Sequence, residues 1–131
     1  MIAYDTRYDP PAPYLQIAVS GLARPRRRRV ARALLDTGSD ITALPRQLAD
    51  LLRLHPIGRL SLEGVEANAT PVFTYAVQLT LADVTIPRLE VILTGLDFAV
   101  LGRDVLNRFY ALLNGPDLTF DLGQSPLLAP H

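Results

Sequence analysis

One aspartate in this chain lies where a carboxylate can do chemistry. Asp36 follows the apolar run of residues 33–35 and is itself followed by Thr37, Gly38 and Ser39. Such a run can form a buried strand, and the turn after it can present the carboxylate at the floor of a cleft. Two carboxylates in contact share one proton, so the ionised one can accept a proton from water while the protonated one polarises a carbonyl group. Asp36 is therefore a candidate for hydrolysing a peptide bond with an activated water.

The neighbours of Asp36 suit the same hypothesis. Thr37 can fix the turn through its hydroxyl, Gly38 permits close approach of the backbone, and Ser39 can donate a hydrogen bond to the carboxylate. The alternative is an Asp-Thr-Gly turn that joins two strands for purely local reasons. Ala-Leu-Leu before the triplet and Ser-Asp-Ile-Thr from Ser39 onward favour the catalytic interpretation.

The second carboxylate must come from outside this segment. The chain holds a single Asp-Thr-Gly, because the Asp-Leu-Gly of residues 121–123 lacks the threonine and follows a terminal strand. A second copy of the chain is the expected source, which predicts a two-fold symmetric homodimer with both Asp36 side chains at the axis.

The composition narrows the class of protein. The chain has 131 residues, of which 49% are apolar, so it can bury the core of one domain. Its 13 basic residues balance 13 acidic ones, which does not indicate nucleic acid or a membrane as partner. The chain has no cysteine and two histidines far apart, so we expect no thiol chemistry, no metal site and no cofactor.

No targeting segment is evident in the sequence. Residues 1–13 carry charged side chains and three prolines, whereas a signal peptide needs an apolar core. The apolar runs are shorter than the ~20 residues that span a bilayer. These features predict a cytoplasmic protein.

Alternation of apolar and polar residues predicts a domain built mostly of short strands. Leu15, Ile17 and Val19 show this pattern, and Pro45 suits the first position of a short helix. The order of elements predicts a mainly-β fold with one or two short helices. The expected strands span residues 14–19, 30–35, 60–63, 71–81, 86–93, 98–101, 110–113 and 118–122, and the expected helical segments span residues 45–54 and 103–109.

Prolines indicate where a central strand is not expected, because proline cannot donate to a ladder of hydrogen bonds. Three of them lie within residues 1–13, which we expect to form an irregular N-terminal arm. Pro87 predicts that the strand over residues 86–93 lies at a sheet edge or begins there.

Three segments, in this order, resemble the retropepsin-like aspartic proteases, the single-domain relatives of pepsin that act as homodimers. Residues 33–44 resemble their catalytic segment, residues 100–104 their second diagnostic segment, and residues 118–122 their closing strand. The resemblance implies a small closed β-barrel-like acid-protease fold over residues 14–122, followed by a tail over residues 123–131. It also implies an aspartic endopeptidase that acts as a homodimer on a peptide or protein substrate.

The resemblance also assigns roles to single residues. Asp36 matches the catalytic carboxylate, and Thr37 matches the residue that bonds to its counterpart across the dimer. Gly38 and Asp40 match residues that contact the substrate main chain. Arg103 matches a residue that pairs with Asp40 and braces the base of the cleft.

Two further assignments keep a plain alternative beside them. Residues 61–73 match the hairpin that closes over the substrate in this family, with Gly64 near the bend as a substrate contact; the alternative is an ordinary exposed hairpin. Asp104 receives no catalytic role, because a solvated carboxylate is favourable at the start of a helix.

Arginines at positions 24 and 26–29 form the one conspicuous charge cluster of the sequence. They can bind phosphate or an acidic partner, or they can be the exposed tip of a hairpin between the first two strands. We favour the exposed tip, because no aromatic residues interleave with the arginines to stack on bases.

Three functions therefore remain to be distinguished. The main one is the homodimeric aspartic endopeptidase. The first alternative is a retropepsin-like dimerisation or binding module without activity, and the intact Asp-Thr-Gly-Ser argues against it. The second is a nucleic-acid-binding protein, which the balanced charge and the lack of a known binding motif disfavour.

Overall fold

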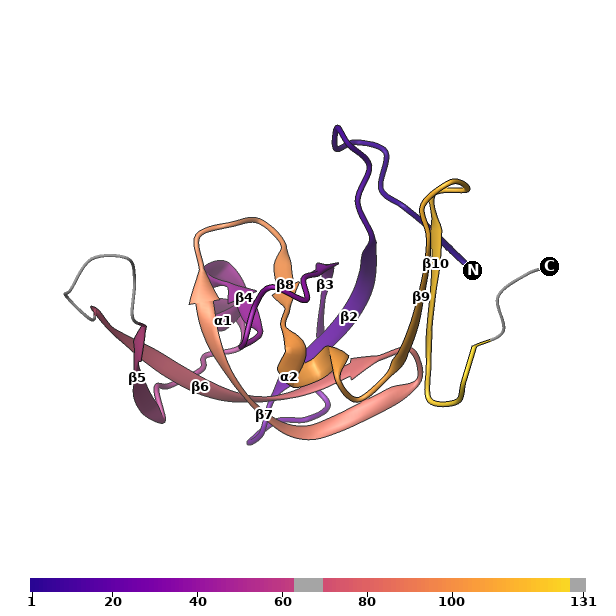
Figure 1. Cartoon of the computed structure of the whole chain (residues 1–131). Helices are drawn as coiled ribbons and strands as arrows, with labels where there is room; N and C mark the ends of the chain where they lie inside the picture. The colour runs from indigo at the N-terminus through magenta and orange to yellow at the C-terminus, as the bar shows by residue number, and fades with distance from the viewer. Residues whose placement is uncertain (63–69, 128–131) are drawn as a thin grey trace.

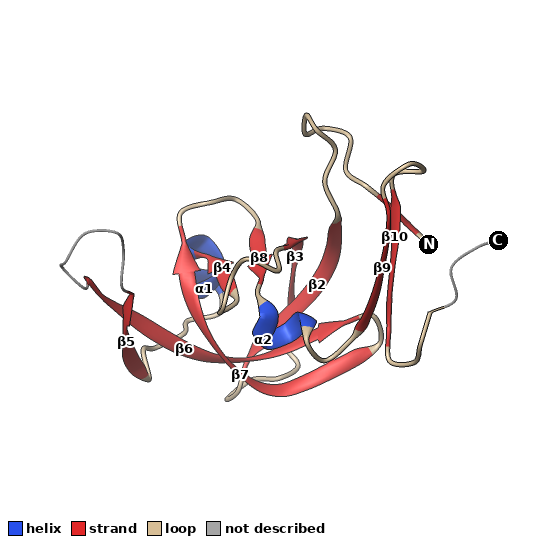
Figure 2. Ribbon diagram, in the orientation of Figure 1, coloured by secondary structure: helices blue, strands red, loops and turns tan. Residues whose placement is uncertain are grey.

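Figure 1 shows the chain as a computed structural model, which describes residues 1–62 and 70–127. Most of the elements are strands, and the two helices are short (Figure 2). In chain order the elements are β1 (Ile2–Ala3), β2 (Tyr14–Gly21), β3 (Arg29–Leu35), β4 (Ala43–Pro45), α1 (Arg46–Leu51), β5 (Gly58–Leu62), β6 (Thr70–Leu81), β7 (Val84–Thr94), β8 (Ala99–Leu101), α2 (Arg103–Leu106), β9 (Tyr110–Asn114) and β10 (Thr119–Gly123).

Six strands close into a barrel. Their order in the larger sheet is β2-β3-β8-β4-β7-β6, followed by β5 at the edge, and a second pairing of β2 with β6 joins the two ends of the six. A separate sheet holds β1, β10 and β9 in that order. The expected mainly-β, closed barrel-like fold with one or two short helices is confirmed.

The core lies inside the barrel and follows the alternation seen in the sequence. Leu15, Ile17 and Val19 of β2 are all buried, while Gln16 between them is exposed. They pack with Leu79 of β6 and with apolar residues of the other strands. The period-2 pattern therefore places the inner face of β2 correctly.

Pro87 lies inside β7 and not at its start, but the expected sheet edge is found there, because β4 pairs with β7 only from Ile92 onward and β6 is the one neighbouring strand at Pro87 in the described part of the chain. The pairing of β6 with β7 changes register between Val77–Leu89 and Leu79–Ile86, so two residues of β7, Pro87 and Arg88, oppose one residue of β6. A bulge leaves its extra residue outside the ladder, and this is how a proline fits within a strand.

The expected irregular arm is partly regular. β1 pairs antiparallel with β10 at the edge of the small sheet, and the three prolines come later in the arm. Sequence patterning does not reveal a strand of two residues whose partner lies near the other end of the chain.

Arg32 of β3 holds the rest of the arm. Its guanidinium donates to the carboxylate of Asp5 and to the Tyr8 hydroxyl, the latter at 2.9 Å, and lies 5.0 Å from the centre of the Tyr14 ring. Hydrogen bonds from Arg7 hold the pKa of Asp5 well below its usual range, so Asp5 stays ionised beside both arginines. The arm is thereby fixed against the strand that leads to Asp36.

Two segments cross beside the end of β3. β8 pairs in parallel with β3, and Ala43 of β4 pairs with Val100 of β8 on its other side. Directly after β8, Gly102 packs so closely on the backbone of Ile41 that an added Cβ would lie 2.8 Å from the Ile41 carbonyl carbon. Only glycine fits this crossing without movement of one backbone.

We therefore expect Gly102→Ala to lower the free energy of unfolding by about 1–3 kcal/mol, the usual cost of overpacking a tight site. Denaturant unfolding of purified protein measures this loss. Gly95→Ala is the matched control, because an added Cβ there meets nothing within 4 Å. Equal stabilities of the two variants would contradict the close approach.

Candidate active site

Asp36 lies directly beyond the last residue of β3 and is half-buried. The parallel pairing of Leu35 with Leu101 continues one residue further, because the Asp36 N–H donates to the Leu101 carbonyl at 3.0 Å. β3 therefore delivers the carboxylate to the turn, as the apolar run predicts. The strand is less buried than expected, because Ala33 is buried while Leu34 and Leu35 are half-buried.

The turn after β3 holds the Asp36 side chain in one orientation. The Gly38 N–H donates to Asp36 Oδ1 at 2.9 Å, and the Ser39 N–H donates to the Asp36 carbonyl at 3.2 Å. A Cβ on residue 38 would lie 3.2 Å from the same Oδ1, so glycine permits the close approach expected of it. Among the described residues no group donates to Oδ2, which leaves this oxygen for a water or for a second carboxylate.

The Ser39 hydroxyl does not bond the Asp36 carboxylate, so that expectation is wrong. It donates instead to the carbonyl of Ile41 at 2.9 Å. A serine hydroxyl often bonds backbone two residues away, and this local acceptor satisfies it within the turn. Ser39 supports the site by shaping the loop that carries Asp36.

Arg103 braces the same loop from α2, and the expected pairing with Asp40 is confirmed. Its guanidinium donates to Asp40 Oδ1 and, at 2.7 Å, to the Thr37 carbonyl, while its backbone N–H donates to the Ser39 carbonyl at 2.8 Å. The side chains of Arg103 and Asp40 are 44% and 85% exposed, so water weakens the ion pair. The ion pair therefore adds little to stability. Its role is to fix the shape of the loop, because the Arg103 side chain bonds both Thr37 and Asp40.

Thr42 and Asp104 form a second brace that the sequence analysis missed. The fully buried Thr42 donates to the Asp104 carboxylate through its N–H at 3.0 Å and its hydroxyl at 2.7 Å. The same hydroxyl accepts from the Gly102 N–H at 3.1 Å. The signal was a threonine inside the apolar run of residues 41–44, because a buried hydroxyl needs a partner.

The proposed substrate-covering hairpin is described only in its stems. β5 and β6 pair antiparallel from Gly58 with Thr74 to Leu62 with Thr70, within the region where a hairpin was expected. Gly64 lies outside the described residues, so its assignment stays a prediction.

The described part of the chain also bears on metal binding and membrane insertion. No group of three or more histidine, aspartate or glutamate side chains there is placed to hold a metal ion. None of its helices is long and apolar enough to cross a membrane.

The family model described as aspartyl protease matches residues 16–105, which span the barrel, the Asp36 turn and both braces. The chain belongs to this aspartyl protease family. No curated protein matches the sequence of this family member.

Solved structures with the same fold include several retropepsin-like proteins. A retropepsin-like aspartic protease from Rickettsia conorii is 16% identical with a TM-score of 0.57, over 83% of this chain and 79% of that one. The simian foamy virus (mac) protease is 16% identical with a TM-score of 0.57, over 72% and 92%. The retroviral protease-like domain of Ddi1 from Leishmania major is 16% identical with a TM-score of 0.50, over 88% and 94%. At these identities the likeness shows a shared fold.

We expect Asp104→Ala to lower the free energy of unfolding by about 2–4 kcal/mol, because it leaves the buried N–H and hydroxyl of Thr42 without their hydrogen-bond acceptor. Thermal or denaturant unfolding measures the change. The exposed Asp97 provides the control, since Asp97→Ala should stay within about 0.5 kcal/mol of the parent protein. A small effect at both positions would show that the Thr42 brace does not support the fold.

Proposed function

We propose that this protein is an aspartic endopeptidase whose active site forms from two copies of the chain. One observation carries the proposal: Asp36 directly follows β3 of the barrel, and one of its carboxylate oxygens is held by the Gly38 N–H, while no described residue donates to the other. Membership of the aspartyl protease family supports the same chemistry.

A second copy of the chain is needed because the two nearby aspartates already have partners within the chain. Asp40 pairs with Arg103, and Asp104 accepts two hydrogen bonds from Thr42. Neither carboxylate is therefore available to share a proton with Asp36. A two-fold axis beside the Asp36 turn would supply the partner by symmetry, with each Thr37 bonding its counterpart to hold the two turns together.

The dyad would act by moving protons in a balanced cycle. The ionised Asp36 removes a proton from water as the water oxygen attacks the scissile carbonyl carbon, while the protonated Asp36 donates its proton to the carbonyl oxygen. The tetrahedral species then collapses as its carbon–nitrogen bond breaks. The nitrogen takes one proton from the dyad, and the hydroxyl that loses its proton returns the dyad to its starting state.

Other residues of the loop would bind and orient the substrate. Gly38 and Asp40 lie on either side of Ser39 and can contact the peptide main chain, because an extended peptide offers alternating N–H and C=O groups. Gly64, which lies between β5 and β6 in the sequence, would also contact the substrate. Arg103 would act as a positioning residue, since it holds Thr37 and Asp40 and does not itself reach the reacting atoms.

Asp36→Asn should abolish cleavage of a casein-type protein substrate, with a loss of roughly 10⁴-fold in kcat, because an amide cannot accept the proton from water. The assay follows cleavage by the full-length protein with and without pepstatin. Unfolding curves and a solution mass for the variant should match those of the parent dimer. Surviving activity in this variant would refute the mechanism, and a monomeric but active parent protein would refute the shared dyad. A folded dimer that cleaves nothing under any condition would favour the alternative of an inactive dimerisation module.

Arg103→Ala should lower kcat/KM roughly ten- to hundredfold, because a loosened loop misplaces the Asp36 carboxylate by a fraction of an ångström or more. Stability should change little, since the Arg103–Asp40 pair is exposed. Arg88→Ala on β7 removes an equal charge from an exposed position and serves as the control. If the two variants retain equal kcat/KM, Arg103 has no positioning role.

A further inference from the structure

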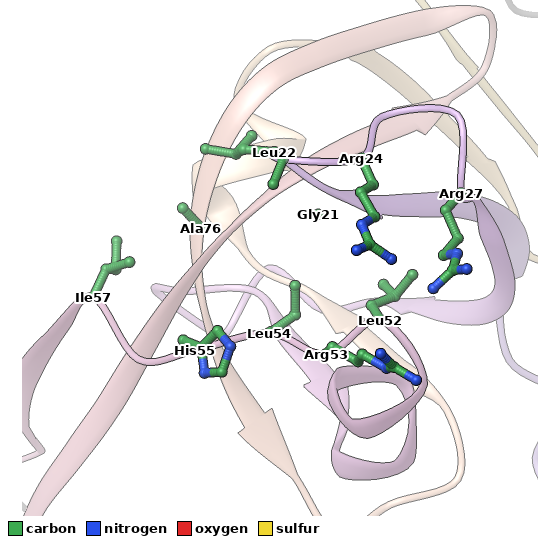
Figure 3. A pocket seen from close by; sticks show the side chains of 11 residues that line it. Gly21, Leu22, Arg24, Arg27, Leu52, Arg53, Leu54, His55, Ile57 and Ala76 are labelled. Carbon is green, nitrogen blue, oxygen red and sulfur yellow. The ribbon is translucent and has the colours of Figure 1, made fainter.

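A cavity of about 390 Å³ lies between the loop that joins β2 to β3 and the segment that follows α1 (Figure 3). The loop contributes Arg24 and Arg27, and the opposite wall contributes Arg53 and His55. The Asp36 chemistry uses none of these residues.

The cavity is remote from the Asp36 turn. Arg27 lies just before β3, and Asp36 follows the other end of that strand. β3 has seven residues, and a strand rises about 3.3 Å per residue, so roughly 20 Å separate the two ends. The cavity therefore forms a second site.

Three arginine side chains lie around the cavity, and the described residues that line it supply no negative charge to balance them. Arg24 and Arg27 extend from successive turns of the loop toward the wall that carries Arg53, as Figure 3 shows. No acidic side chain is among the described residues that line the cavity, and within the described part of the chain none of the three guanidinium groups forms an ion pair. Like charges brought together in this way favour an anionic ligand.

Arg53 occupies a backbone position that favours glycine. α1 ends with the Arg53 N–H bonded to the Asp50 carbonyl at 3.2 Å and the Leu54 N–H bonded to the Ala49 carbonyl at 3.0 Å. Between these two bonds Arg53 has φ of 52°, in the left-handed region. These two bonds form the common Schellman ending of a helix, in which the left-handed position is usually glycine, so the Arg53 side chain costs about 1 kcal/mol relative to glycine there.

The remaining walls of the cavity are apolar. Leu22 and Ile57 are 43% and 49% exposed, and Leu52 and Leu54 complete the lining around the arginines. We therefore expect a ligand of this cavity to carry apolar groups, which contact the leucine and isoleucine side chains, beside its negative charges. Among the described lining residues there is no phenylalanine, tyrosine or tryptophan on which a base can stack, which disfavours nucleic acid.

We propose that this cavity binds an acidic peptide segment in which carboxylate side chains alternate with apolar ones. Arginine pairs with carboxylates through two parallel hydrogen bonds, so Arg24, Arg27 and Arg53 can hold acidic side chains while Leu22 and Ile57 receive the apolar ones. The proposal does not depend on whether the Asp36 site cleaves peptides.

The test uses a fluorescein-labelled peptide with the central sequence Glu-Leu-Glu-Leu-Glu and measures its anisotropy on titration with full-length protein. Mass spectrometry of the recovered peptide confirms that it stays intact, which separates binding from cleavage. The double variant Arg24→Gln/Arg27→Gln should weaken binding about tenfold or more. The double variant Arg26→Gln/Arg28→Gln removes the same charge from neighbours outside the cavity and should change it less than about threefold.

Arg53→Gly separates binding from stability. It should weaken peptide binding severalfold while the melting temperature stays equal or rises by a few degrees, because glycine relieves the left-handed strain. A labelled peptide with serine in place of leucine should also bind more weakly than the original.

Three results would overturn the proposal. Equal weakening by the two double variants would show diffuse attraction to the loop and no site. Unchanged peptide affinity in Arg53→Gly would show that Arg53, on the opposite wall of the cavity, does not contact the peptide. Tighter binding of a single-stranded oligothymidylate than of the peptide would assign the arginines to nucleic acid.

Discussion

A buried threonine and the carboxylate that satisfies it tie the two halves of the candidate active site together. Thr42 follows the Asp36 turn, and Asp104 lies in the first turn of α2. Two hydrogen bonds join Thr42 to Asp104, and a third joins it to Gly102. Leaving such buried groups unpaired costs about 1–3 kcal/mol each, so the crossing has one favourable arrangement. The exposed bonds from Arg103 and the orientation of Asp36 are built on that arrangement.

Local patterns in the sequence predicted most of the fold and the centre of the site. Alternating apolar residues located most of the strands to within a few positions, because a strand that buries one face must repeat every two residues. β1 and β4 were not predicted, because strands of two or three residues are too short to show this alternation, and Pro45, expected to begin the helix, is the last residue of β4. The apolar run before Asp36 predicted a strand that delivers a carboxylate to a turn, and the structure has this geometry. The pairing of Arg103 with Asp40 came from the resemblance to retropepsin-like proteases and is confirmed.

Contacts between distant segments were not predictable in the same way. The partner of Thr42 lies 62 residues away in the chain, so its identity depends on how β4 and β8 cross. The Ser39 hydroxyl had either a side-chain or a backbone acceptor as candidate, and which one it bonds depends on the shape of the turn; in the structure it is the Ile41 carbonyl. The place of Pro87 within β7 was not predicted, because a bulge is a property of two strands and cannot be seen in one.

The short strand β1 has a consequence for how the protein would be regulated. β1 pairs with β10 of its own chain, and the six strands of the barrel also close within one chain. In the proposed dimer, two such chains would dock to bring their Asp36 turns together. Catalysis would then depend on protein concentration by the law of mass action: dilution would separate the subunits and lower the activity, and a higher concentration would restore it.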